Sequence, residues 1–192
     1  LHFQTLRIFF KLLFPELTSI QMAILEEVLE DLYNKFGIYW ETDISRLKNT
    51  DFPIMTDLYD LLKIHYDREI NNARKENLNI LLSLIRQISE SADSSIFNGH
   101  TTIQRNSKLV CLDTANIQNA SENVKKAQYF NVLSWCWEQI SKNRNEKIKL
   151  VADEAYLLID KNCLQSIAFL RNVSKRCRKY ERKFGHCFAL NY

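Results

Sequence analysis

The first half of the chain carries apolar residues at every third or fourth position, which is the spacing of amphipathic helices. This pattern predicts helices over residues 18–37 and 55–66, and a third that ends near residue 91. One face of the third helix is apolar at Leu78, Leu81, Leu82, Ile85 and Ile88. We therefore expect residues 1–92 to form an antiparallel helical subdomain.

Local signals mark the ends of the first of these helices. Thr18 is followed three residues later by Gln21, which is the spacing of a capping box. Gly37 is placed to end the same helix. The whole chain has only three glycines and two prolines, and so few breaking residues favour helices over many short strands.

The pattern changes in residues 93–192. Apolar runs that fit buried strands alternate there with amphipathic segments that fit helices. The predicted strands cover 109–113, 148–152 and 187–190, and the predicted helices cover 121–142 and 164–183. Strand–helix alternation is typical of a parallel α/β sheet, so the predicted fold class is α/β and helix-rich.

Composition narrows the class of protein. Hydrophobic residues make up 46% of the chain and charged residues 26%, which is typical of a globular domain and unlike a disordered chain. No apolar run approaches the roughly 20 residues needed to span a bilayer. The five cysteines form no C-x-x-C pair, which argues against zinc and is typical of a reducing, cytoplasmic environment.

Basic residues concentrate in one stretch near the end of the chain. Residues 171–183 contain seven lysines and arginines against the single acid Glu181, although the net charge of the chain is only +3. Such a stretch attracts polyanions such as phosphate or nucleic acid. It also fits the solvated face of an ordinary helix, and the sequence leaves both interpretations open.

The segment with the clearest chemistry runs from Lys149 to Asp160. An apolar strand ends there in two adjacent acids, Asp153 and Glu154, which is the Walker B arrangement of P-loop ATPases. Asp153 is placed to hold Mg²⁺ through a water, and Glu154 to orient and deprotonate the water that attacks the γ-phosphate. The same dipeptide also fits an acidic cap on the helix that follows.

Further stretches in the same order resemble the type IV secretion and conjugative-transfer ATPases, which are RecA-like relatives of DNA pumps. The basic stretch resembles the family's helix after the Walker B strand. The other stretches are Phe10–Pro15, Met55–Leu62, Phe97–Thr101, Phe130–Trp135 and Val151–Asp160.

This resemblance implies a fold and a function. Residues 1–92 would be the helical insertion of the family, and 93–192 an incomplete RecA-like sheet. In the intact protein, ATP and Mg²⁺ would bind at Asp153 and Glu154. The family's basic helix carries arginines that reach the nucleotide of a neighbouring subunit, and the matching candidates are Arg171, Arg176 and Arg178, each of which also fits a plain surface arginine.

The resemblance also implies partners and a location. We expect a hexamer, contacts with other secretion-system subunits, and a place at the inner face of the cell membrane, reached only through that complex. DNA is a further candidate partner.

The sequence lacks one essential part of such an ATPase. No G-x-x-x-x-G-K-[ST] phosphate-binding loop occurs in the 192 residues, and the chain begins at Leu1 without a methionine. We therefore expect a fragment that is inactive alone and binds no nucleotide alone. Two alternatives remain: a non-catalytic helical interaction module of a secretion machine, and a nucleic-acid-binding domain that uses the basic stretch.

Overall fold

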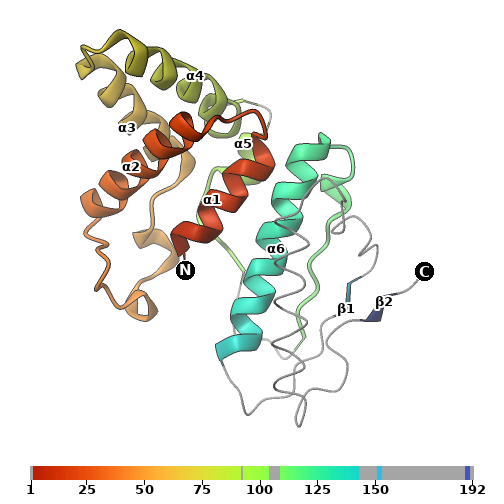
Figure 1. Ribbon diagram of the computed structural model, residues 1–192. Coiled ribbons are helices and arrows are strands. Elements are labelled where there is room, and N and C mark those ends of the chain that lie inside the picture. The colour runs from red at the N-terminus through yellow and green to blue at the C-terminus, as the bar shows by residue number, and fades with distance from the viewer. Residues whose placement is uncertain (1, 92, 104–108, 143–150, 153–188, 191–192) are drawn as a thin grey trace. The chain divides into compact units, whose positions relative to one another are not determined.

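A computed structural model describes residues 2–91, 93–103, 109–142, 151–152 and 189–190. Contacts divide the chain into two compact units (Figure 1). We call residues 16–110 the helical unit, and residues 1–15 together with 111–192 the second unit.

The helical unit is built on α2 (Ser19–Lys35), α3 (Met55–Arg68) and α4 (Asn72–Ser89). It also contains the short helix α5 (Ser94–Phe97) and the 3-10 turns η1 (Ile44–Arg46) and η2 (Asn49–Asp51). Three residues join α3 to α4, and these two helices pack against each other and against α2 (Figure 1). All three helices match predicted ones.

The apolar faces of these helices form the core of the unit. On α4 the fully buried residues are Leu78, Leu81, Ile85 and Ile88, as the helical spacing predicted. Helix α2 buries Leu25 and Val28 near its middle, whereas Ile20 at its start is 65% exposed. Apart from Ile20, the apolar face of α2 is therefore buried from Met22 to Tyr33, and α2 packs against α3 and α4.

The predicted capping box at the start of α2 is confirmed. The Thr18 hydroxyl accepts a hydrogen bond from the Gln21 backbone N–H at 3.2 Å, and the Gln21 side chain accepts one from the Thr18 N–H at 3.0 Å. The two bonds satisfy N–H groups that have no partner within a helix.

The second unit contains α1 (His2–Leu13) and α6 (Glu122–Lys142), which are in contact, together with the 3-10 turn η3 (Ala115–Ile117). Helix α1 buries its apolar face, including Phe9 and Phe10, and α6 buries Val124, Ala127 and Phe130. Helix α1 therefore belongs with α6, whereas the sequence pattern predicts that it is part of a helical subdomain of residues 1–92. The helix that packs against α1 therefore lies far from it in the sequence.

Two short strands are also described. The strands β1 (Val151–Ala152) and β2 (Ala189–Leu190) pair in parallel, with Val151 opposite Ala189 and Ala152 opposite Leu190. Both fall inside predicted strands. The other residues of those two strands, 148–150 and 187–188, and the predicted helix 164–183 lie outside the described residues, so the larger sheet stays a prediction.

The predicted strand at 109–113 is wrong. These residues form no strand, and the side chains of Leu109 and Val110 are 87% and 40% exposed. The boundary between the two units falls within this run, after Val110. An apolar run becomes a buried strand only where another strand pairs with it, and no strand among the described residues does so.

Candidate functional site

The candidate catalytic acids follow directly after strand β1 in the sequence. Val151 and Ala152 form the strand, and Asp153 and Glu154 are the next two residues. The two acids lie outside the described residues, as do the three candidate arginines Arg171, Arg176 and Arg178. The structure therefore supplies the strand that precedes the acids, and the roles of all five residues stay predictions.

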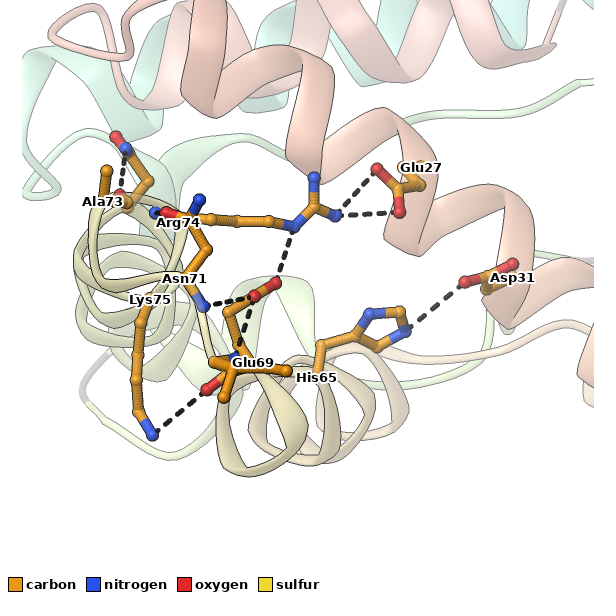
Figure 2. Close-up of polar contacts among 10 residues, drawn as sticks. Glu27, Asp31, His65, Glu69, Asn71, Ala73, Arg74 and Lys75 are labelled. Carbon is orange, nitrogen blue, oxygen red and sulfur yellow. Dashed lines mark hydrogen bonds and ion pairs between the residues drawn. The ribbon is translucent and has the colours of Figure 1, made fainter.

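A polar cluster that the sequence did not predict lies in the helical unit (Figure 2). Its centre is Arg74, in the first turn of α4. The Arg74 Nη2 atom donates hydrogen bonds to both carboxylate oxygens of Glu27 on α2, each at 2.8 Å, and Nε lies 3.0 Å from Oε2 of Glu69. One guanidinium group thus links α2 to the corner between α3 and α4.

The same corner is held together by local hydrogen bonds. The Glu69 Oε1 atom accepts from the backbone N–H groups of Ile70 at 3.0 Å and Asn71 at 2.8 Å. The Asn71 side chain then caps α4 by accepting from the Arg74 N–H at 3.1 Å. These contacts fix the first turn of α4, and with it the direction in which Arg74 leaves the helix.

Beside the contacts of Arg74, a second link joins α2 directly to α3. His65 Nε2 is 3.4 Å from Oδ2 of Asp31 (Figure 2). The two links border a shallow pocket of about 350 Å³ that Glu27, His65, Glu69 and Arg74 line together with Leu61, Ile64 and Arg68.

The charges in this cluster are arranged to hold helices together. The hydrogen bond that Arg74 donates to Glu27 is the main reason that the pKa of Arg74 is raised, so a cation is retained between two carboxylates. Glu27 and Glu69 both accept from that cation, and no group of three metal-ligating side chains occurs in the part of the chain that the structure describes. We interpret the cluster as a structural clasp between helices.

Part of this cluster could have been predicted from the sequence. Glu27 and Asp31 are four residues apart on α2, and His65 and Glu69 are four residues apart at the end of α3, so each pair shares a helix face. Which faces meet across helices depends on the tertiary packing. The spacing of residues within a single helix therefore could not reveal the partners of Arg74.

We expect replacement of Arg74 by methionine to lower the stability of the chain by about 1 kcal/mol. Methionine keeps part of the apolar stem but leaves Glu27 and Glu69 without their cation, and partial exposure limits the loss. Urea unfolding followed by circular dichroism measures it. The control is Arg86→Met, which removes an exposed pair with Glu90 within one helix and should change stability by at most about 0.5 kcal/mol. Equal effects of both variants would contradict the clasp.

Two of the stretches that carry the family resemblance meet in the helical unit. The Asn98 side chain donates to the Thr56 hydroxyl at 2.8 Å and to the Ser89 carbonyl at 2.9 Å, and it accepts from the Thr56 N–H at 3.1 Å. Asn98 thereby joins the start of α3 to the end of α4. The stretches 55–62 and 97–101 share one hydrogen-bonded site.

No helix in the described ranges has the length and apolar character needed to cross a membrane.

Neither a protein-family model nor a curated protein matches the chain. A solved structure does match: VirB4 of Thermoanaerobacter pseudethanolicus superposes with a TM-score of 0.85 at 38% sequence identity. The match covers 98% of this chain and 48% of the VirB4 chain, so this chain spans about half the length of that protein.

This similarity agrees with the resemblance drawn from the motifs. An identity of 38% across nearly all of the 192 residues lies far above what a shared fold alone requires, and the TM-score of 0.85 shows that the two proteins share a fold. The chain is a relative of VirB4 and belongs to the family of type IV secretion ATPases.

Proposed function

We propose that this chain is part of a type IV secretion motor ATPase, in which it supplies the acidic end of the catalytic strand. ATP hydrolysis by the intact protein would energise the transfer of DNA or protein. The observation that carries the proposal is the position of Asp153 and Glu154, directly after a strand that pairs in parallel, in a chain that is 38% identical to VirB4.

The chemistry follows from that position. In open parallel sheets, ligands bind beyond the carboxyl ends of the strands, and the two acids follow the carboxyl end of β1. Asp153 would hold Mg²⁺ through a water, because carboxylate oxygens suit this ion and it keeps most of its hydration. Glu154 would orient the attacking water and take its proton.

The remaining parts of the site would come from elsewhere. The sequence contains no phosphate-binding loop of the form G-x-x-x-x-G-K-[ST], so we propose that a further part of the protein supplies it. The chain alone would then hydrolyse no ATP. By resemblance, one of Arg171, Arg176 and Arg178 would reach the nucleotide of a neighbouring subunit in a hexamer. Membership of a secretion complex would hold the protein at the inner face of the membrane.

Replacing Asp153 by asparagine tests the metal role. In the longer protein that includes the phosphate-binding loop, we expect the variant to weaken Mg²⁺-dependent ATP binding by about tenfold or more, because the water-bridged carboxylate is lost. Isothermal titration with and without Mg²⁺ measures this difference. Binding in the absence of Mg²⁺ should stay unchanged.

A matched control exists in the same stretch. Asp160→Asn removes one acid seven residues further along and should leave Mg²⁺-dependent binding at the wild-type value. If Asp153→Asn also binds Mg²⁺–ATP normally, the catalytic interpretation is wrong. A non-catalytic helical interaction module of the secretion machine would then be the better interpretation.

A further inference from the structure

The connection that follows α2 exposes a group of large apolar side chains. We call residues 36–44 the aromatic loop. The exposed fractions are 39% for Phe36, 56% for Tyr39, 71% for Trp40 and 56% for Ile44. Exposed apolar side chains that are grouped in this way mark surfaces that bind another molecule.

The base of the aromatic loop is fixed to the helical unit. Gly37 has a φ of +74°, which a residue with a side chain rarely adopts, and its N–H donates to the Asn34 carbonyl at 2.9 Å. The next N–H, of Ile38, donates to the Tyr33 carbonyl at 2.9 Å, and the Ile38 side chain is buried. The chain therefore leaves α2 in one defined direction.

Trp40 is held by one edge of its ring. The indole N–H donates to Oε1 of Glu30 on α2 at 3.2 Å. Two hydrogen bonds close the turn that carries the ring: the Tyr39 N–H donates to the Thr42 hydroxyl at 2.8 Å, and the Thr42 N–H donates to the Tyr39 carbonyl at 3.0 Å. Because Trp40 is bonded through its edge and is largely exposed, the ring offers its face to a ligand. A ring that is already oriented loses little entropy on binding.

Acidic side chains dominate the charge around this ring. Residues 26–43 contain six acids and a single base, a lysine. Glu30 and Glu41 are both exposed, whereas Asp43 already pairs with Arg46 at 3.2 Å. The face of an indole ring attracts cations, and the Glu30 carboxylate at its edge adds a full negative charge. The ring and the carboxylate together favour a cationic ligand.

The geometry favours arginine over other cations. A guanidinium group is planar, so it can stack on the face of Trp40 while its N–H groups reach the Glu30 carboxylate. Trp40 uses one oxygen of Glu30, and a carboxylate accepts several hydrogen bonds. A lysine ammonium group carries the same charge but cannot stack. The helical unit already contains a cation–ring contact of the lysine kind, in which Nζ of Lys75 lies 4.8 Å from the centre of the Tyr66 ring.

We propose that Trp40 and Glu30 bind an arginine side chain of another protein, while Tyr39 and Ile44 pack against apolar residues beside that arginine. A free small cation needs only the ring and the carboxylate, whereas exposed apolar side chains before and after Trp40 suit a polypeptide segment. A membrane surface fits less well, because the acids around Trp40 repel anionic lipid headgroups. The site belongs wholly to the helical unit, needs no nucleotide and does not depend on the proposed ATPase function.

Peptides that differ in a single side chain test the site. Each has blocked ends and a central residue between two leucines, and that residue is arginine, lysine or citrulline, which has the shape of arginine without its charge. Fluorine NMR of a chain labelled with fluorotryptophan locates binding, since the Trp40 signal is the one that Trp40→Phe removes. The arginine peptide should shift this signal saturably and less strongly in high salt. The lysine peptide should bind about threefold or more weakly, and the citrulline peptide should not bind.

A conservative variant tests the carboxylate. Glu30→Gln removes the charge but keeps a carbonyl oxygen for the Trp40 N–H, so the loop stays in place. The dissociation constant of the arginine peptide should rise by about threefold or more, as loss of an exposed charge pair allows. Glu76→Gln removes another exposed acid, on α4, and should leave the constant unchanged. The proton signals of the peptide measure binding to every variant, and circular dichroism checks that each is folded.

The outcomes decide the proposal. An arginine peptide that leaves the Trp40 signal unchanged overturns it, and so does equal binding of the arginine and citrulline peptides or of wild type and Glu30→Gln. A Trp40 signal that responds only to vesicles of anionic lipid would assign the loop to a membrane instead. A signal that shifts with protein concentration alone would assign it to a contact between copies. Saturable binding of the arginine peptide at Trp40 that Glu30→Gln weakens and Glu76→Gln does not establishes the site.

Discussion

Replacing Glu154 by glutamine is expected to lower ATP hydrolysis by about 10²–10⁴-fold in the longer protein that includes the phosphate-binding loop. Glutamine has nearly the same size and still offers a carbonyl oxygen, but it cannot accept the proton of the attacking water. Phosphate release under saturating ATP measures the loss in rate. The nucleotide itself should bind as in the wild type, because in the proposed mechanism Glu154 acts on the water and Asp153 on the metal.

The proposed roles of the two acids can be distinguished by measuring the rate of ATP hydrolysis and the binding of Mg²⁺–ATP separately. Asp153→Asn should weaken Mg²⁺-dependent binding, whereas Glu154→Gln should leave the dissociation constant for Mg²⁺–ATP within about twofold of the wild-type value. Full hydrolysis by Glu154→Gln would contradict its role as the base. A variant that neither binds nor hydrolyses ATP would point to a changed fold, which circular dichroism of the helices would reveal.

Replacing Leu81 by alanine should destabilise the chain by about 2–5 kcal/mol, the largest stability effect that we expect. Leu81 lies in the middle of α4, its side chain is 0% exposed, and α4 packs against both α2 and α3. Alanine removes the buried contacts and leaves a cavity that the three helices can fill only in part. Urea unfolding followed by circular dichroism at 222 nm measures the change in free energy.

The neighbouring residue provides the control. Ile80 lies on the same helix, carries an aliphatic side chain of the same size and is 40% exposed. Ile80→Ala should cost at most about 1 kcal/mol, because the Ile80 side chain is already 40% exposed to water and its removal leaves no enclosed cavity. Equal destabilisation by both substitutions would contradict the burial of the face of α4 that carries Leu81.

The helices of this protein are largely determined by local sequence. The capping box of Thr18 and Gln21 acts over three residues, and the apolar face of α4 repeats within a single helix. Interactions of such short range can be found from one sequence. The predicted helices at 18–37, 55–66 and 121–142 therefore agree with α2, α3 and α6 to within a few residues.

The candidate site was predicted less completely from the sequence than the helices were. The order of motifs indicated the family, and the similarity to VirB4 confirmed it, because a family resemblance resides in the sequence itself. Strand β1 was predicted where Val151 and Ala152 form it. The side chains of Asp153 and Glu154 lie outside the described residues, so their roles rest on position along the chain and on the experiments above.

Only the tertiary structure decided which segments meet. The sequence placed the first helix with its neighbours in the chain, whereas α1 packs on α6, more than a hundred residues away. It predicted a buried strand at 109–113, where Leu109 is exposed, and it did not predict the clasp of Arg74 with Glu27 and Glu69. Helix starts and apolar faces depend on neighbours within about four residues, so the sequence alone determines them. The partner of a buried face or a charged side chain depends on the free energy of packing the whole chain, which a local pattern does not contain.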